Sequence, residues 1–437
     1  MGGCDLEPSS ASRLSSREII GLVDAHCFYV SAHCVFEPSL IGRPVVVASN
    51  GDSAVVSRSD QAKKLGVKMS QPIHELRDLV AREGLIIRSS NYALYHDMSR
   101  RLMQAIAAEV PALDEYSVDE AFILLTGVQG NIEDVARRIQ SSVFKKVGIP
   151  TGVGVSVNKT TAKLCNWASK QWKARTDSVV VLREPERLRK LMEYADVGEV
   201  WGIGPRLKEH LNSMGILKAW HLANADPATI RRHFGVTVER TVRELNGHQC
   251  LGFGELAGPR KMLTMSRSFG DVARNLATME AAVATYTARL AVKLRREKSV
   301  ARCVRVFIQT SRSATMEIGY RTSDCIAFER PTSDTRELTA ATLAILRKIY
   351  KNGCTYVKAG VIISEAIPEE GMIADLFAPP PRLKSREVME AVDRINSLMG
   401  EHALRFGRQS PDPYMNMKTG FRSDRATTSW HELARAR

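Results

Sequence analysis

The sequence lacks any long hydrophobic run. No apolar stretch reaches the roughly 18 residues that a membrane span needs, and the N-terminus has no charged segment followed by an apolar one. Among its eight cysteines no two have C-x-x-C spacing, and no two histidines have zinc-finger or H-E-x-x-H spacing. These absences argue against a membrane protein, a structural zinc module and a disulfide scaffold. We expect a cytoplasmic protein with free thiols.

Glycine-rich phosphate loops are missing as well. The sequence contains no G-x-x-x-x-G-K-[ST] loop, and Gly252-x-Gly254 lacks the strand-to-helix context of a dinucleotide fold. There are no internal repeats and no low-complexity tracts. Any chemistry on phosphates must therefore rely on metal ions and side chains.

The composition that is present belongs to an ordinary globular protein with an excess of positive charge. The 437 residues carry 62 basic and 48 acidic side chains, a net charge of +14. At roughly 150 residues per domain, this length predicts about three domains. The charge favours a polyanionic partner such as nucleic acid, but charge alone leaves a merely basic protein equally open.

Periodicity divides the chain into three kinds of pattern. Strands alternating with helices up to about residue 184 predict a mixed α/β domain. Pro185 to Gly247 is predicted to be wholly helical. A β-α-β-β-α-β order follows from Met262 to Ser364, with its third strand expected at about Met316–Arg321. One further helix is expected at Ser385–Met399.

Two places in the α/β region offer carboxylates for phosphate chemistry. Asp24 ends the first predicted strand, and Asp119 and Glu120 lie together in a strand predicted from Tyr116 to Leu125. Neighbouring acids in apolar surroundings are costly unless a cation compensates them, and Mg²⁺ favours oxygen ligands shared with substrate phosphates. Consecutive strand residues face opposite ways, so both acids can bind metal only near a strand end or bend. A solvated pair at a hairpin tip is the open alternative.

Several segments in chain order resemble the Y-family, or lesion-bypass, DNA polymerases, with the nearest likeness in the UmuC branch. The likeness covers about residues 20–425, and five ordered motifs make it specific. The five are Asp24–Ser31 (DAHCFYVS), Gly42–Val47 (GRPVVV), Ala62–Lys68 (AKKLGVK), Tyr116–Phe122 (YSVDEAF) and Trp201–Gly204 (WGIG). The segments that support the branch are Ser89–Tyr95, Glu239–Leu245 and Ser266–Gly270.

This resemblance implies a multi-domain α/β protein with the right-hand-like architecture of a polymerase. The implied domains are a flexible extension (1–18), a mixed-sheet palm (19–36 and 90–184), small fingers (37–89), a helical thumb with a helix-hairpin-helix (185–250), a split-βαβ little finger (259–366) and a partner-binding C-terminal tail (367–437).

The resemblance also implies roles for particular residues. Asp24, Asp119 and Glu120, with the backbone carbonyl of Ala25, correspond to the ligands of two Mg²⁺ ions. Tyr29 corresponds to a steric gate that would clash with a 2′-hydroxyl; the alternative for Tyr29 is an ordinary core aromatic. The set that corresponds to the deoxynucleoside triphosphate clamp comprises the backbone N–H groups of Cys27 and Phe28 together with Ser57, Lys63 and Lys170.

DNA contacts are implied in the two C-terminal domains. Gly202 and Gly204 match a turn in which glycines let backbone N–H groups approach phosphates; a plain helix-capping turn is the alternative. Arg295, Arg296 and Arg302 belong to a dense basic stretch, of which some members should contact phosphates and others should be solvated.

Three departures from the UmuC pattern stand out. His26 replaces the usual Asn of the metal motif, and His33 falls where a Glu is common; either could alter nucleotide handling. The clamp-binding peptide is present only as Ile373–Phe377 (IADLF), without its Gln, which should weaken docking to a sliding clamp.

The resemblance implies an error-prone translesion DNA polymerase subunit that adds deoxynucleotides to a primer opposite damaged template, in SOS mutagenesis and DNA damage tolerance. Its implied partners are primer-template DNA, a UmuD-type dimer and RecA. One alternative is a non-catalytic DNA-binding and partner-recruiting subunit in which His26 and His33 mark a decayed site. A palm-type nucleotidyl cyclase is a weaker alternative, because it leaves the basic C-terminal domains without a purpose.

Overall fold

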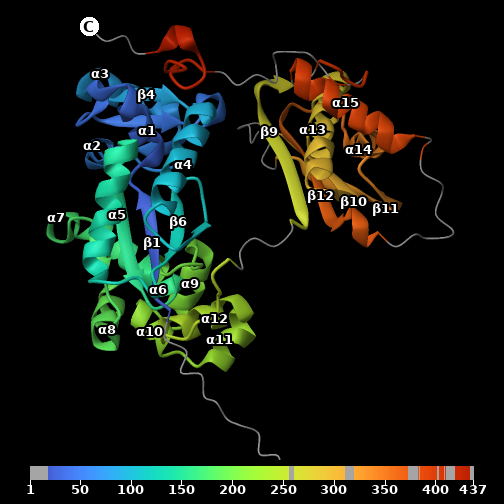
Figure 1. The fold of residues 1–437 in the computed structure, drawn as a ribbon. Coiled ribbons are helices and arrows are strands. Elements are labelled where there is room, and N and C mark those ends of the chain that lie inside the picture. Colours follow the sequence, from blue (N-terminus) through green and yellow to red (C-terminus); the bar gives the residue numbers. More distant parts are fainter. Residues whose placement is uncertain are drawn as a thin grey trace, which may run out of the picture. The chain divides into compact units, whose positions relative to one another are not determined.

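The structure is a computed structural model that describes residues 18–254, 260–310, 319–372, 382, 384–400, 403–407, 409 and 419–433. The chain forms two compact units (Figure 1). The first comprises the chain up to residue 257 together with the segment from Thr419 onward, and the second comprises residues 258–418. Within the described ranges, no helix is both long and apolar enough to cross a bilayer.

A five-stranded sheet forms the centre of the first unit. Its order is β5-β6-β1-β7-β8, and β1 is antiparallel to both of its neighbours. The strands are β1 (Ile20–Ala25), β5 (Ala112–Glu115), β6 (Glu120–Leu124), β7 (Thr151–Ser156) and β8 (Val179–Val181). Both faces of the sheet are covered, which explains why β1 and β7 contain almost no exposed residue.

Opposite faces of this sheet carry different helices (Figure 1). Ile123 of β6 packs in a cluster with α4 (Tyr92–Ala107) and α5 (Ile132–Val147). Its neighbour Phe122 packs with Ala162 of α6 (Lys159–Gln171) on the other face. Alternate residues of the strand thus contribute to separate cores.

Gly154 allows α6 to lie directly on β7. A Cβ atom at this position would stand 2.1 Å from the backbone nitrogen of Asn166 and 2.5 Å from the carbonyl oxygen of Ala162. Any larger residue would push helix and strand apart, because both obstructing atoms belong to the backbone. This close approach sets where the side chains of α6 stand above the sheet.

A smaller sheet with its own core follows α1 (Phe28–Phe36) in the chain. Its order is β3-β2-β4, with β2 antiparallel to β3 and parallel to β4. Its elements are η1 (Pro38–Leu40), β2 (Val45–Ala48), η2 (Asn50–Asp52), β3 (Val55–Arg58), α2 (Asp60–Lys64), η3 (Ile73–Leu76), α3 (Arg77–Glu83) and β4 (Ile86–Ser89). A separate cluster of buried apolar side chains, which includes Val46 and Leu76, stabilises it.

The C-terminal segment returns to this small sheet. We call residues 419–433, which include η8 (Trp430–Glu432), the C-terminal strap; it lies in red beside β4 in Figure 1. The backbone N–H of Ser89 donates to the carbonyl of Phe421 over 2.8 Å, and the N–H of Gly420 donates to Asp52 Oδ2 over 2.6 Å. The strap therefore extends the edge that β4 would otherwise leave open.

The segment from Pro185 to Leu245 is helical, as predicted for Pro185 to Gly247. The elements are α7 (Lys173–Thr176), which precedes β8, and then α8 (Pro185–Tyr194), η4 (Val197–Glu199), α9 (Pro205–Ser213), α10 (Ala219–Ala223), α11 (Pro227–Phe234) and α12 (Val236–Leu245). Helices α8, α9 and α11 each begin at a proline, whose fixed φ suits the first helical turn. Buried Glu244 of α12 accepts a hydrogen bond from the N–H of Thr160 over 3.1 Å and so ties this region to α6.

The second unit is a four-stranded antiparallel sheet in the order β11-β10-β12-β9. Its core lies between the sheet and two helices, and the predicted β-α-β-β-α-β order is confirmed. The elements are β9 (Met262–Ala273), α13 (Leu276–Arg296), β10 (Ser299–Thr310), β11 (Arg321–Thr332), α14 (Thr335–Ile349), β12 (Tyr356–Pro368) and η6 (Glu369–Gly371). The strand expected at Met316–Arg321 was placed wrongly: β11 starts at Arg321. β11 is an edge strand with few apolar residues, so its sequence lacks the apolar run or alternation that usually marks a strand.

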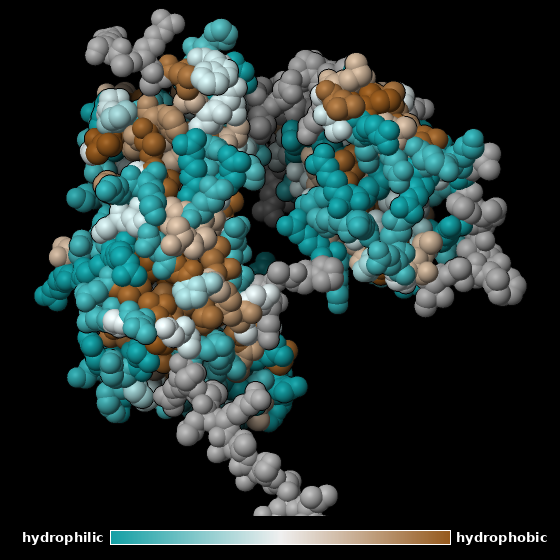
Figure 2. All heavy atoms as spheres, viewed as in Figure 1, coloured by the Kyte–Doolittle hydropathy of each residue, from teal (hydrophilic) through white to brown (hydrophobic). Residues whose placement is uncertain are grey.

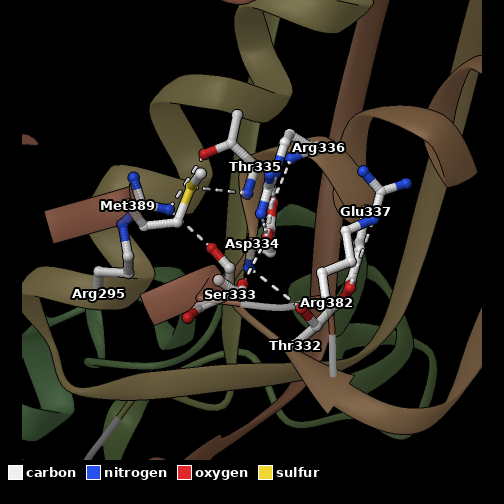
Figure 3. A network of polar contacts seen from close by, with 10 residues as sticks. Arg295, Thr332, Ser333, Asp334, Thr335, Arg336, Glu337, Arg382 and Met389 are labelled. Atoms are coloured by element: carbon white, nitrogen blue, oxygen red, sulfur yellow. Dashed lines mark hydrogen bonds and ion pairs between the residues drawn. The ribbon is translucent and has the colours of Figure 1, made fainter. Parts of the chain in front are cut away.

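Helix α15 (Ser385–Met399) belongs to the second unit and packs beside the end of α13 and the start of α14 (Figure 3). The guanidinium of Arg295 binds both carboxylate oxygens of Asp393, at 2.7 and 2.8 Å, and Ser385 Oγ donates to Asp334. Met389 is the buried side chain of the helix, and its sulfur accepts from the N–H of Thr335. Val388, Leu398 and Met399 of α15 are exposed. A brown patch lies over the same helix in Figure 2.

Candidate active site

Three carboxylates meet at one end of the central strands. Asp24, near the end of β1, is directly opposite Glu120, the first residue of β6. The N–H of Ala25 donates to the carbonyl of Asp119 over 2.8 Å, which holds Asp119 beside the same strand end. The strand predicted from Tyr116 begins only at Glu120, so Asp119 lies in the turn between β5 and β6. The bend that two neighbouring acids need in order to face one site is therefore present.

Burial separates this pair from a solvated hairpin tip. Asp119 and Glu120 do lie at the β5–β6 turn, as the alternative supposed, yet Asp119 is partly buried and the side chain of Glu120 is only 16% exposed. The side chain of Asp24, opposite Glu120, is 14% exposed. Burial raises the pKa of both carboxyl groups, and the charge of Asp119 raises them further. The charge of Asp119 thus opposes the ionisation of Asp24, and the charges of Asp24 and Asp119 oppose that of Glu120.

Helix α6 supplies the positive charges that oppose this effect. Lys170 Nζ lies 2.7 Å from Asp24 Oδ2, and Lys163 Nζ lies 3.1 Å from Glu120 Oε1. Asn166, between them on the helix, donates to Asp24 over 3.3 Å. The spacing of 163, 166 and 170 places all three side chains on one face of α6.

The donor set fits a divalent cation. In the described ranges, no group of three or more His, Cys, Asp or Glu side chains is arranged to hold a metal ion as it stands. The acids at the strand end are nevertheless hard oxygen donors, and the charges of Asp24, Asp119 and Glu120 act on one another. Such a cluster has the chemistry of a magnesium site, with Lys163 and Lys170 as its local counter-charges.

Backbone N–H groups and lysine side chains come together next to the carboxylates, at the start of α1. Cys27 precedes the helix in a left-handed conformation (φ 49°), and the first N–H groups of a helix have no intrahelical partner. Lys63 Nζ lies 3.3 Å from Cys27 Sγ and 2.8 Å from Asp60 Oδ1. Lys173 approaches the other oxygen of Asp60 at 3.6 Å. Burial, followed by the charges of Lys173 and Lys170, lowers the pKa of His26 to about 4, so its ring is neutral.

Ser57 also belongs to the predicted clamp, and its place there stays a prediction. It is buried in β3, and its hydroxyl makes no hydrogen bond within the described part of the chain. Of the other predicted members, Lys63 lies beside Cys27 and Lys170 lies beside Asp24.

Tyr29 stands on α1 with its ring stacked on that of Tyr95 from α4. The ring centroids are 4.2 Å apart and the ring planes differ by 18°. Tyr29 is half-buried, whereas Tyr95 is 2% exposed and hydrogen-bonded through its hydroxyl to His33 Nε2 at 2.8 Å. Tyr29 thus rests with one face on Tyr95 and is less buried than its neighbour.

Sequence reasoning missed Lys163, Asn166 and Lys173. Lys163 also lies 4.1 Å from the ring centroid of Tyr116 and 5.3 Å from that of Trp201. The indole N–H of Trp201 donates to Tyr116, which joins the helical region to the carboxylate turn. The helical spacing from Lys159 to Lys170 was the available signal for the two α6 residues. Nothing in the sequence indicated Lys173.

The predicted DNA contacts differ in exposure. Gly202 (φ 87°) and Gly204, which caps α9, are both exposed, and only Gly202 needs glycine for its conformation. Arg296 and Arg302 are exposed as well. Arg295 requires a correction. Its side chain is 12% exposed and binds Asp393 and the carbonyl of Ser333, so it holds α15 in place and is not displayed to a ligand.

The arrangement has the architecture of a known enzyme class. The structure matches a Y-family DNA polymerase chimera of Dbh and Dpo4 with a TM-score of 0.63 and 21% sequence identity, over 82% of this chain and 100% of that one. DinB from Sulfolobus solfataricus matches with a TM-score of 0.50 and 21% identity, over 80% and 99% of the two chains. The fold is therefore that of a Y-family DNA polymerase.

Sequence comparison identifies the family within the Y-family polymerases to which the chain belongs. Residues 23–166 match the impB/mucB/samB family, and residues 260–376 match the C-terminal domain of that family. UmuC of Salmonella typhimurium (strain LT2) is 39% identical over 96% of this chain and 100% of its own length. MucB of Escherichia coli is 36% identical over 95% and 99% of the respective lengths. The chain belongs to this UmuC-related family of translesion DNA polymerases, as the motifs predicted.

A third match falls on the C-terminal region. Residues 386–436 match a domain of unknown function, DUF4113. Nearly all of α15, in the second unit, and the C-terminal strap, in the first unit, fall in this segment.

Proposed function

We propose that Asp24, Asp119 and Glu120 are the catalytic carboxylates with which this chain extends primers opposite damaged template. The observation that carries the proposal is the register of Asp24 against Glu120, with Asp119 held beside them and two lysines of α6 facing the group. The three acids, with the carbonyl of Ala25, would hold two Mg²⁺ ions. Bound Mg²⁺ supplies activation of the primer 3′-hydroxyl and charge stabilisation at the reacting phosphate.

The chain's own residues bind the incoming deoxynucleoside triphosphate. The N–H groups of Cys27 and Phe28 at the start of α1, together with the ammonium groups of Lys63 and Lys170, offer donors and positive charge to its phosphates. Half-buried Tyr29 follows Phe28 directly in the same helix. We propose that Tyr29 excludes nucleotides that carry a 2′-hydroxyl.

The exposed residues of the C-terminal domains hold the primer-template duplex. Gly202 and Gly204 present backbone N–H groups before α9, and Arg296 and Arg302 present side chains from the second unit. Ser57 remains a weaker member of the proposed nucleotide site, because it lies buried in β3. Arg295 is not part of the proposed duplex contact.

The partners are proposed from the relatives. A UmuD-type dimer and RecA are expected to act with the chain on damaged DNA in a cytoplasmic complex. Docking to a sliding clamp is proposed at Ile373–Phe377, a segment that lies outside the described residues.

The experiment that tests the site is primer extension on undamaged and lesion-bearing templates, with Mg²⁺ and with the UmuD-type dimer and RecA supplied. Asp119→Ala combined with Glu120→Ala should abolish extension and leave DNA binding unchanged. The matched control is Glu133→Ala combined with Asp134→Ala, which removes two adjacent exposed acids from α5. Extension by the Asp119/Glu120 variant at the parental rate would overturn the site assignment. Tight DNA binding by the parent without any incorporation would favour the non-catalytic alternative.

A further inference from the structure

Tyr95 provides the surface against which Tyr29 rests. The two rings are nearly parallel at a centroid distance of 4.2 Å, so one face of Tyr29 rests against Tyr95. Stacking of this kind fixes both the distance and the tilt of a ring. Tyr29 cannot retreat toward the core without displacing Tyr95.

Tyr95 is itself fixed from three sides. It is 2% exposed, on the buried side of α4. The ring of His33 meets it edge-on, at a centroid distance of 5.6 Å and an angle of 86°, and His33 Nε2 lies 2.8 Å from its hydroxyl oxygen. Phe28 adds a tilted contact at 6.4 Å.

Helix geometry connects these contacts. Tyr29 and His33 are four residues apart on α1, so their side chains are neighbours on one face of that helix. Tyr95, which comes from α4, contacts both of them. The buried ring of Tyr95, which comes from another helix, therefore restricts how the Tyr29 side chain can be oriented on α1.

We infer that Tyr95 is a positioning residue that holds the Tyr29 ring at its working distance from the nucleotide sugar, and that His33 locks Tyr95 in place. The inference rests on the proposed role of Tyr29 as the sugar gate. Steric exclusion of one hydroxyl group depends on the position of the ring within a fraction of an ångström, and misplacement by about 1 Å can cost a hundredfold in a preorganised site. Removal of the support should relax sugar selection more than it slows deoxynucleotide insertion.

The hydroxyl of Tyr95 and its ring have separable roles. Tyr95→Phe keeps the stacked ring and removes the hydrogen bond to His33, so we expect a small rise, about twofold, in ribonucleotide use relative to deoxynucleotide use. Tyr95→Leu removes the flat surface, and we expect a rise of roughly tenfold. His33→Gln, whose amide can still bond the hydroxyl, should behave like the parent, and His33→Leu like Tyr95→Phe.

The test is single-nucleotide insertion by the full-length chain with its partners, using dNTPs and rNTPs separately, with kcat and KM determined for each. Leu102→Ala is the control for general loosening, because Leu102 is a fully buried residue of the same helix and core cluster. It should lose stability and keep the parental sugar selectivity. A Tyr29→Ala arm defines the full loss of the gate, and Tyr95→Leu should add nothing to it in the double variant.

The outcomes separate the two hypotheses. If Tyr29→Ala leaves sugar selectivity unchanged, the proposed gate is wrong. If Tyr29→Ala relaxes selectivity but Tyr95→Leu changes it no more than Leu102→Ala does, only the role of Tyr95 is overturned. Thermal shifts of the complex with a dideoxy-terminated primer, measured with dNTP and with rNTP, give the same comparison through binding alone. The inference would be contradicted if the difference between the dNTP shift and the rNTP shift were the same in the parent and in Tyr95→Leu. This result does not depend on catalysis.

Discussion

The ammonium nitrogen of Lys170 lies 2.7 Å from Asp24 Oδ2, which links the proposed phosphate clamp to the proposed metal ligands through one side chain. Burial raises the pKa of Asp24, and Lys170 is the main group that lowers it. The lysine therefore favours the ionised form of the carboxylate, and in the proposed site the same charge would serve the phosphate clamp.

Replacement of Lys170 tests this double role. Lys170→Met keeps most of the side-chain length and removes the charge, so we expect KM for dNTP to rise about tenfold and kcat to fall as well. Lys145→Met, at an exposed position in the last turn of α5, is the matched control and should behave like the parent. Steady-state insertion over a range of dNTP concentrations measures both constants. An unchanged KM would show that Lys170 serves the acids alone.

The site could be predicted from sequence where motifs are contiguous. Asp24, Asp119 and Glu120 were identified in this way, and the structure brings them to one strand end. Contacts between distant residues could not be predicted, because no local pattern records them. Lys163 is indistinguishable in sequence from a solvated helical lysine until Glu120, 43 residues away, is placed beside it.

The same limit explains the error at Arg295. A dense basic stretch predicts phosphate contacts, but the partner of Arg295 is Asp393, 98 residues further along the chain. The polar strand β11 was misplaced for a related reason, because an edge strand with few apolar residues has almost no sequence signal. The other helices and strands described in the second unit, whose signal is local periodicity, lie close to their predicted positions.

Arg295 and Arg302 form a natural pair for testing which arginines contact DNA. Arg302→Ala removes an exposed charge and should weaken primer-template binding at every sequence, with a decrease of about 1 in the slope of log K against log salt. Arg295→Met should leave that slope unchanged, since its guanidinium is bound to Asp393. It should instead lower the free energy of unfolding of the second unit by about 2 kcal/mol.

Fluorescence-anisotropy titrations from low to moderate salt, together with urea unfolding, distinguish the two effects. Arg386→Met, at an exposed position of α15, is the control for loss of charge near the same helix. A reduced salt slope for Arg295→Met would return this residue to the duplex contact.

The C-terminal strap should protect the edge of the small sheet. The N–H of Ser89 donates to Phe421, and the N–H of Phe421 donates to Ser89 Oγ over 3.0 Å. Deletion of the chain from residue 419 leaves the Ser89 amide facing solvent, so its hydrogen exchange should accelerate by at least about tenfold. The amide of Val46, in the central strand β2, is the internal control and should exchange at the parental rate. Equal protection of Ser89 in both proteins would mean that the strap does not remain docked in solution.

The buried imidazole of His33 should make the stability of the first unit depend on pH. Burial is the main cause that lowers its pKa from the ordinary 6.5 to about 4; nearby Glu37 raises it, and Arg88, which is ion-paired with Glu37, lowers it. Above pH 6.5 the ring is neutral in both folded and unfolded protein. Between pH 6.5 and pH 4 the unfolded chain binds a proton that the folded chain does not, so stability falls as the pH falls.

His33→Gln removes this dependence and keeps a hydrogen-bonding group beside Tyr95. Relative to the variant, the parent should lose about 2 kcal/mol of unfolding free energy between pH 7 and pH 5, because the unfolded ring is almost fully protonated at pH 5 and the folded ring is not. Urea unfolding of both proteins at pH 7, 6 and 5 measures the difference. His26, whose pKa is also lowered to about 4, is present in both proteins, so its contribution cancels. Parallel pH profiles would show that His33 is protonated as readily in the folded protein as in the unfolded chain.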